Sequence, residues 1–179
     1  MIGVLVSGAG TNLQALLDAE LPVRAVASNR AGAPALARAA GLPTAAFELA
    51  EYASRAERDA AMAAWLEAQG VELVVLAGYM HILTPAFLGR FPGRVINVHP
   101  SLLPDFPGAH AVADQLAAGV AESGVTVHVV DEGVDTGPIL LQERVAVHDG
   151  DTVETLHARI KQVEHRLLPQ AIEGLLCAR

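Results

Sequence analysis

The stretch Arg94-Val95-Ile96-Asn97-Val98-His99-Pro100-Ser101-Leu102-Leu103-Pro104 decides the fold and carries the first chemical signal of this chain. Its β-branched apolar residues predict a buried strand over 94–98, and the following proline holds His99 extended and ends the strand. Residues two apart on a strand point to the same face, so we expect Asn97 and His99 to project side by side. An amide donor beside a proton-carrying imidazole suits chemistry at a carbonyl oxygen. The stretch therefore predicts an enzyme with its site at a strand end.

Strand-like and helical segments alternate on both sides of this stretch. We expect strands over residues 2–7, 23–28, 44–47, 72–77, 94–98, 125–130 and 139–147, and helices over 13–20, 34–40, 54–69, 85–90, 109–118 and 151–176. Such alternation is typical of an α/β fold in which helices cover both faces of a mainly parallel sheet. No helix separates the last two strands, so we expect these to be antiparallel. The 179 residues predict one domain with a Rossmann-like, open, twisted sheet.

The composition limits the class of function. The formal net charge of −8 argues against nucleic-acid binding, which needs a basic face. No window approaches the roughly 18 consecutive apolar residues of a membrane span. The N-terminus lacks the basic region and cleavage site of a signal peptide, and the single cysteine, Cys177, fits a reducing compartment. We therefore expect a cytoplasmic protein without nucleic-acid or membrane partners.

A glycine-containing loop, Gly8-Ala9-Gly10-Thr11-Asn12, follows the first expected strand. Leu13 replaces the third glycine of the dinucleotide-binding pattern, and no carboxylate for a ribose follows the second strand, which argues against a nicotinamide or flavin site. Backbone N–H groups at a helix N-terminus still suit an anion, so a single phosphate, such as that of a ribonucleotide, is expected here. The alternative is a tight turn that binds nothing, with Thr11 or Asn12 as the helix N-cap.

A second loop, Asp131-Glu132-Gly133-Val134-Asp135-Thr136-Gly137-Pro138, follows the expected strand over 125–130. A carboxylate from this loop beside His99 would favour the charged, proton-donating imidazole, and the glycine-flanked Asp135 is the better candidate. His128 is expected to be a hydrogen-bonded core histidine. The remaining histidines lack metal-ligand spacing, so we expect no metal, and solvent-facing or capping roles are expected for His81, His110, His148, His157 and His165.

Five motifs occur in order along nearly the whole chain: Ser7-Gly8-x-Gly10-Thr11-Asn12-Leu13-Gln14-Ala15, Leu76-Ala77-Gly78-Tyr79-Met80, Asn97-Val98-His99-Pro100-Ser101-Leu102-Leu103-Pro104, Val127-His128-x-Val130 and Val134-Asp135-x-Gly137-Pro138-Ile139. Together they resemble the phosphoribosylglycinamide formyltransferase family of folate-dependent enzymes. The wider formyltransferase superfamily shares the Asn-x-His and the later Asp. The N-terminal glycine loop is the part that separates this family from its relatives.

The resemblance implies transfer of the formyl group of 10-formyltetrahydrofolate, a co-substrate, to the amine of 5-phosphoribosylglycinamide. It implies a phosphate-binding half at about 1–95, a folate-binding and catalytic half at about 96–179, and a monomer or homodimer. The implied catalytic residues are Asn97, His99 and Asp135. The implied ribonucleotide-binding residues are Gly10, Thr11, Asn12, Lys161, Gln162, Val163 and Glu164. The implied folate-binding residues are Arg55, Met80, His81, Ile82, Leu83, Asn97, Asp131, Glu132, Gly133, Val134 and Asp135. The chain departs from the family at His81, where relatives often carry arginine, and it ends soon after its last expected helix.

Other functions remain open at this point. A formyltetrahydrofolate deformylase would use water in place of the amine with similar catalytic residues. A non-catalytic nucleotide- or folate-binding module would bind its ligand without turnover. A methionyl-tRNA formyltransferase usually has a further C-terminal domain and a basic surface, so this short acidic chain argues against one. Leu5 stands where the nucleophile elbow of a serine hydrolase would need glycine before Ser7, so that class is not expected.

Overall fold

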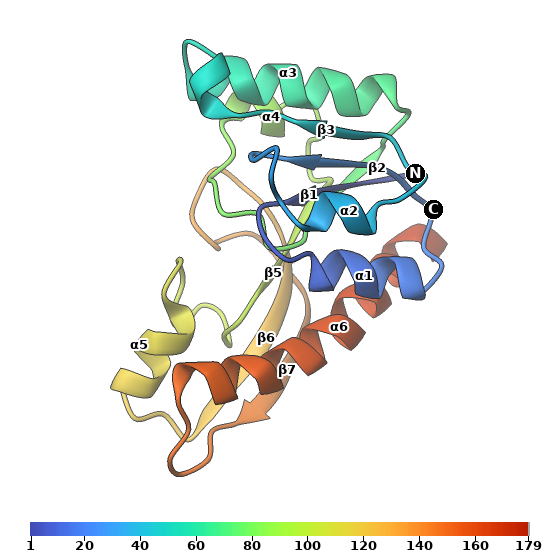
Figure 1. Ribbon diagram of the computed structural model, residues 1–179. Helices are drawn as coiled ribbons and strands as arrows, with labels where there is room; N and C mark the ends of the chain where they lie inside the picture. The colour runs from blue at the N-terminus through green and yellow to red at the C-terminus, as the bar shows by residue number, and fades with distance from the viewer. Residues whose placement is uncertain (179) are drawn as a thin grey trace.

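A seven-stranded sheet runs through the computed structural model, which describes residues 1–178 (Figure 1). The strand order is β3-β2-β1-β4-β5-β6-β7. The strands are β1 (Ile2–Val6), β2 (Val23–Ser28), β3 (Thr44–Ala46), β4 (Leu73–Leu76), β5 (Val95–His99), β6 (Glu122–Val129) and β7 (Ile139–Ala146). The first five strands pair in parallel, whereas β6 is antiparallel to both β5 and β7. The prediction of a mainly parallel sheet with antiparallel C-terminal strands is confirmed.

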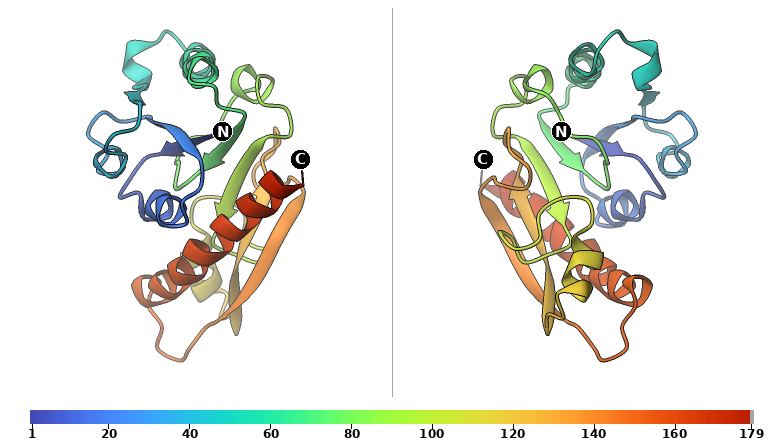
Figure 2. Two further views of the ribbon diagram at one scale, coloured as in Figure 1. Left: turned by 90° about the vertical axis from the view of Figure 1, so that its right-hand side faces the viewer. Right: turned by 90° about the vertical axis from the view of Figure 1, so that its left-hand side faces the viewer.

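Helices cover both faces of this sheet (Figure 1). They are α1 (Thr11–Asp18), α2 (Ala35–Arg38), α3 (Arg55–Ala68), α4 (Pro85–Leu88), α5 (Ala111–Ala117) and α6 (Val153–Cys177), with a short 3₁₀ helix, η1, at Leu49–Glu51. In Figure 1, α3 lies on one side of β1–β3, and α1, α2 and α6 lie on the other. Figure 2 shows α6 running obliquely across β6 and β7. Within residues 1–178, no helix is long and apolar enough to cross a bilayer.

Two hydrophobic cores explain why the central strands are apolar throughout. On β1, Val4 packs into the core under α1 and α6, whereas the next residue, Leu5, packs into the core under α3. All five residues of β1 are buried because both faces of the sheet are covered. The strand therefore reads as a continuous apolar run rather than as an alternation.

The boundaries of β6 differ most from the sequence-based expectation. This strand begins at Glu122, three residues before the expected start at Val125. Ser123 and Gly124 read as turn residues, but they pair with Val145 and Arg144 of β7. The ladder satisfies their backbone groups, so the long hairpin with β7 overrides the local preference of these two residues.

Candidate active site

Strand β5 presents Asn97 and His99 on one face, and the neighbouring β6 adds a third side chain. Asn97 is paired with His128 in the antiparallel register of β5 and β6. Opposed residues of such a pair have neighbouring side chains, and Asn97 Nδ2 lies 3.3 Å from His128 Nε2. Both histidines are buried, with His99 4% and His128 1% exposed. An amide and two imidazoles therefore meet on one face of the sheet.

The Asp135 carboxylate lies at the centre of this cluster. Its Oδ2 is 3.3 Å from His99 Nδ1 and accepts a hydrogen bond of 2.8 Å from the Gly108 amide. Its Oδ1 is 3.5 Å from His128 Nε2 and 3.4 Å from Asn97 Nδ2. One carboxylate thus contacts every polar member of the cluster and also the loop that follows β5.

The loop between β6 and β7 is built to deliver Asp135 to this position. Asp135 adopts the left-handed conformation with φ 55°, which Asp tolerates better than most residues. Asp131 Oδ1 accepts a hydrogen bond of 2.7 Å from Thr136 Oγ1, which closes the loop on itself. A Cβ at Gly137 would overlap the carbonyl oxygen of Val129, so only glycine lets the chain pass so close to β6. In this structure the Asp131 carboxylate organises the loop that carries Asp135.

The environment of Asp135 keeps its carboxyl group ionised. Burial raises the pKa of Asp135, but the hydrogen bond to His128, the Gly108 N–H and the charges of His99 and His128 lower it to about 2. The carboxylate is therefore negative throughout the neutral range. It is an acceptor for every group around it.

Both ring nitrogens of His99 face hydrogen-bond acceptors. Nδ1 faces the Asp135 carboxylate, and Nε2 lies 2.8 Å from the carbonyl oxygen of Phe106. A neutral imidazole has one N–H and can donate to one of these oxygens, whereas the imidazolium donates to both. The two acceptors therefore fix the orientation of the His99 ring beside Asn97 and Asp135.

His128 is more than the core histidine that the sequence predicted. Its Nδ1 lies 2.9 Å from the Val129 carbonyl, which only accepts, so this nitrogen carries a proton. Nε2 is left to face Asn97 and Asp135. The signal for this role lay in the strand pairing, because an antiparallel partner of β5 must place one residue opposite Asn97.

The cluster opens into a cavity of about 510 Å³. Most of the predicted folate-binding residues line it, namely Met80, His81, Ile82, Leu83, Asn97, Asp131, Gly133, Val134 and Asp135. Met80, Ile82 and Val134 are 71%, 56% and 46% exposed, so apolar side chains gather at its mouth. Of the same set, Arg55 and Glu132 are exposed and are not among the described residues that line the cavity. An apolar mouth over a polar floor suits a flat organic ligand.

Three histidines expected at the surface or at helix caps belong to this cavity. His81 and His157 both line it and are partly buried, and a third, His110, lines it while exposed at the N-cap of α5. Burial lowers the pKa of His81, and the charges of Arg58 and Arg55 lower it further. Burial and then the Lys161 charge lower the pKa of His157. The resemblance had placed His81 among the folate-binding residues, whereas the position of His157 depends on packing against elements far away along the chain and was not predicted.

The glycine loop before α1 is clamped by α2. Gly10 has φ 73°, and a Cβ there would lie 2.5 Å from the Cβ of Ala35. The Ala35 amide donates to the Gly8 carbonyl at 3.0 Å, and Arg38 Nε donates to the Ala9 carbonyl at 2.7 Å. Gly10 itself is the N-cap of α1 without a side-chain capping bond, so the expectation that Thr11 or Asn12 caps this helix is wrong. α2 thus holds the loop through the carbonyl groups of Gly8 and Ala9.

Asn12 joins this loop to α6. Its Nδ2 donates a hydrogen bond of 2.9 Å to Oε2 of Glu164, and both residues are buried. Asn12 Oδ1 is buried without a hydrogen-bond partner among the described residues. Burial raises the pKa of Glu164, although the Asn12 hydrogen bond and the Lys161 charge oppose this effect. Thus Gly10, Thr11, Asn12 and Glu164 lie together, whereas Gln162 is exposed and Val163 packs against the core.

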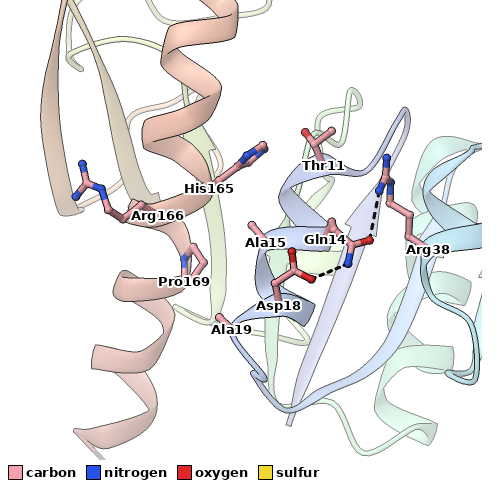
Figure 3. Close-up of a pocket in the computed structure, with 9 residues that line it drawn as sticks. All are labelled: Thr11, Gln14, Ala15, Asp18, Ala19, Arg38, His165, Arg166 and Pro169. Atoms are coloured by element: carbon pink, nitrogen blue, oxygen red, sulfur yellow. Dashed lines mark hydrogen bonds between the residues drawn. The ribbon is translucent and has the colours of Figure 1, made fainter.

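A groove of about 600 Å³ lies beside the same loop, between α1 and α6 (Figure 3). Gln14 crosses part of it, donating to Asp18 Oδ1 at 2.8 Å and accepting from Arg38 at 3.3 Å. His165 reaches towards α1 from α6, as Figure 3 shows. Of the predicted site residues, Thr11 lines the groove. None of its lining residues lines the catalytic cavity, so the two hollows are separate.

Known proteins are similar to this chain in both sequence and fold. The formyl transferase family model matches residues 1–172. The phosphoribosylglycinamide formyltransferase of Mycobacterium tuberculosis is 51% identical over 178 residues, covering 96% of this chain and 83% of that protein. The crystal structure of phosphoribosylglycinamide formyltransferase from Streptococcus pneumoniae has a TM-score of 0.94 at 44% identity and covers 98% of both chains. That of glycinamide ribonucleotide transformylase 1 from Symbiobacterium toebii has a TM-score of 0.93 at 51% identity, covering 96% of this chain and 84% of that one. The chain also matches 18% of the trifunctional purine biosynthetic protein adenosine-3 of Gallus gallus at 46% identity.

Proposed function

This chain belongs to the formyl transferase family, and we propose that it transfers a formyl group from a reduced folate to the amine of phosphoribosylglycinamide in purine biosynthesis. The observation that carries the proposal is the convergence of Asn97, His99 and the ionised Asp135 on the floor of one cavity. An amide donor and a charged imidazole are the groups that stabilise an oxyanion at a formyl carbon.

We assign the formyl donor, 10-formyltetrahydrofolate, to the cavity of about 510 Å³. Met80, Ile82 and Val134 supply an apolar mouth for the ring system, and the polar cluster at the floor meets its formyl group. The backbone of the two loops that line the cavity offers donors and acceptors for the heterocycle. Arg55, exposed at the first turn of α3, is free to meet a charged tail that extends into solvent.

We assign the ribonucleotide to the N-terminus of α1. The N–H groups of Gly10, Thr11 and Asn12 lie where a helix start binds phosphate. Glu164 accepts one hydrogen bond, from Asn12, which leaves carboxylate lone pairs for the hydroxyls of a ribose. This site draws on both the phosphate-binding half, at about 1–95, and the folate-binding and catalytic half, at about 96–179. We propose that these halves form one domain.

The reaction follows from these assignments as a direct transfer. The amine nitrogen of the ribonucleotide attacks the formyl carbon and forms a C–N bond, and the carbonyl electrons move onto oxygen. Asn97 donates to that oxyanion, and the His99 imidazolium stabilises it and supplies a proton. The bond between the formyl carbon and the folate nitrogen then breaks. The proton lost by the amine balances the proton gained by the folate nitrogen. The proton that His99 gave to the oxyanion returns to His99 as the carbonyl of the product reforms, so the enzyme returns to its initial state.

The role of Asp135 is to hold His99 charged and oriented. Its carboxylate also contacts His128, which positions the carboxylate from the opposite side of the cluster. We further propose that the protein acts in the cytoplasm as a monomer or a homodimer, in line with its net charge of −8 and its single cysteine. Neither assignment changes the chemistry at the site.

Incubation of the purified protein with glycinamide ribonucleotide and 10-formyltetrahydrofolate tests the proposal. We expect stoichiometric formation of formylglycinamide ribonucleotide and tetrahydrofolate. Release of formate at the same rate without the ribonucleotide would identify a deformylase instead. Binding of both ligands without turnover would identify a non-catalytic binding module.

A further inference from the structure

The most deeply buried charge of the molecule lies outside the catalytic cluster. Arg58 and Asp59, adjacent residues of α3, are both fully buried and form an ion pair with Arg58 Nη2 2.6 Å from Asp59 Oδ1. Arg58 Nε donates to the same oxygen at 2.9 Å. Burial of such a pair costs desolvation energy that its own attraction often does not repay. Stability alone therefore does not explain why this ion pair is buried.

Both members of the pair reach out to the segment 80–84, which follows β4. Arg58 Nη1 lies 2.7 Å from Nδ1 of His81, and the Thr84 amide donates to Asp59 Oδ2 at 2.7 Å. Arginine is always a donor, so Nδ1 of His81 must be the acceptor. The ion pair thus holds the segment at two points, His81 and Thr84, three residues apart.

The ends of β1 and β2 hold the beginning of the same segment. The Met80 amide donates to Ser7 Oγ at 2.9 Å, and Ser7 Oγ in turn donates to Asn29 Oδ1 at 2.6 Å. Asn29 Nδ2 lies 3.2 Å from the second ring nitrogen of His81. A neutral imidazole has one acceptor nitrogen, and Arg58 occupies it, so Asn29 Nδ2 contacts His81 without a hydrogen bond. Ser7 and Asn29 thus hold the start of the segment, and Arg58 holds the ring of His81.

The segment held in this way forms one wall of the catalytic cavity. Met80, His81, Ile82 and Leu83 line it, and two of these apolar side chains are more than half exposed. Arg58 and Asp59 are not among the described residues that line the cavity, so neither meets a bound molecule. Their effect on a ligand must pass through the segment that they hold.

We propose that Arg58 is a positioning residue for the formyl donor, fixing the cavity wall at 80–84 through its contact with His81 and its ion pair with Asp59. The inference rests on the proposed function and adds to it a residue outside the site. A wall fixed before the folate arrives spares the complex the cost of ordering it on binding. The loop Gly10–Asn12, which we assign to the ribonucleotide, is held separately by α2. Loss of Arg58 should therefore weaken binding of the formyl donor and leave binding of the ribonucleotide unchanged.

The neutral form of His81 suits this role. Burial lowers the pKa of His81, the charges of Arg58 and Arg55 lower it further, and Asp59 opposes them. Tyr79 packs against the ring edge-on, with 6.0 Å between ring centroids. The ring is thus kept uncharged beside a permanent cation, and so it accepts rather than repels.

Two single substitutions and their combination test the proposal. Arg58→Lys keeps a cation beside Asp59, but one ammonium group lacks the fork that reaches Asp59 and His81 together. His81→Ala leaves the ion pair intact and removes the contact to it, which provides a test even if Arg58→Lys does not fold. For each, we expect the KM for 10-formyltetrahydrofolate to rise roughly tenfold, with the KM for the ribonucleotide within about twofold of wild type.

Because both changes remove the same contact, the double variant should be no worse than either single one. His81→Gln, whose amide oxygen accepts from Arg58, should recover most of the donor affinity. Arg90→Met is the matched control. Arg90 is an exposed arginine outside α3 that forms an ion pair with Glu67 of α3, the helix that carries Arg58. We expect both KM values of this control to equal those of wild type.

Titration calorimetry with tetrahydrofolate, the product of the formyl donor, measures the affinity of the same site without turnover. If the wild type binds tetrahydrofolate but does not formylate the ribonucleotide, the proposed function fails while the loss of affinity in the variants still tests this inference. Unchanged donor affinity in a folded variant, equal changes in all kinetic constants, additive effects in the double variant, or absence of tetrahydrofolate binding to the wild type would each overturn it.

Discussion

Oδ2 of Asp135 lies 3.3 Å from Nδ1 of His99, and the opposite ring nitrogen of His99 lies 2.8 Å from the carbonyl oxygen of Phe106. The imidazole is therefore held between a carboxylate and a carbonyl, two groups that accept hydrogen bonds and never donate them. Its partners come from two different loops, one after β5 and one after β6. This arrangement orients the ring before any substrate is present, which is the preorganisation that electrostatic catalysis requires.

Replacement of the carboxylate should therefore damage the chemical step rather than substrate binding. For Asp135→Asn we expect kcat to fall on the order of 10²–10⁴-fold, because the neutral amide no longer favours the imidazolium, with both KM values nearly unchanged. Steady-state kinetics of the formylation reaction measures this split. Asp149→Asn, a change at an exposed carboxylate, is the control. Near-wild-type kcat in folded Asp135→Asn would remove Asp135 from the mechanism.

The same carboxyl group links folding stability to acid pH. The pKa of Asp135 is about 2 in the folded protein against an ordinary value of 3.8, so the unfolded chain takes up the proton first as the pH falls. The stabilisation, about 2 kcal/mol, is thus fully present above pH ~4 and is lost between pH ~4 and ~2. Urea unfolding of wild type and Asp135→Asn across this range measures it. The difference in the free energy of unfolding between them should shrink as the pH falls, and a constant difference would contradict the assignment.

Much of this structure was predictable from local sequence, and the exceptions share one cause. The apolar run of β1 and the β-branched run of β5 lie in strands as expected, since period and propensity act locally. His128 is a buried, hydrogen-bonded histidine as expected, but its place beside Asn97 depends on a strand pairing across 31 residues, which no local pattern reveals. Arg58 precedes buried Met62 by one helical turn, a spacing that puts both on the inner face of α3. The sequence does not single out Arg58, because an arginine is rarely fully buried and local spacing does not reveal its partners Asp59 and His81.

Glu164 should govern the ribonucleotide and not the folate. Among the residues that the structure describes, its buried carboxylate has one hydrogen-bond partner, Asn12, and it faces the glycine loop. For Glu164→Gln we expect the KM for the ribonucleotide to rise about 10- to 100-fold, because hydrogen bonds to a charged acceptor are worth roughly 1.5–3 kcal/mol. The KM for 10-formyltetrahydrofolate should stay within about twofold. Glu173→Gln, at an exposed position of the same helix, is the control, and a shift in the folate KM for Glu164→Gln would contradict the assignment.

Gly137, in the loop between β6 and β7 that carries Asp135, should not tolerate a side chain. A Cβ there overlaps the Val129 carbonyl oxygen, which belongs to β6 and cannot give way without breaking the ladder. Gly137→Ala must then push the loop outward and carry Asp135 away from His99, so stability should fall by about 1–3 kcal/mol and kcat should fall with it. Gly32→Ala is the matched control, because an added Cβ there meets no atom within 4 Å. Thermal unfolding and kcat, measured on both variants, separate the two effects. Loss of stability in Gly137→Ala with undiminished kcat would mean that the loop relaxes without moving Asp135, and the claim that this glycine sets the catalytic geometry would then be wrong.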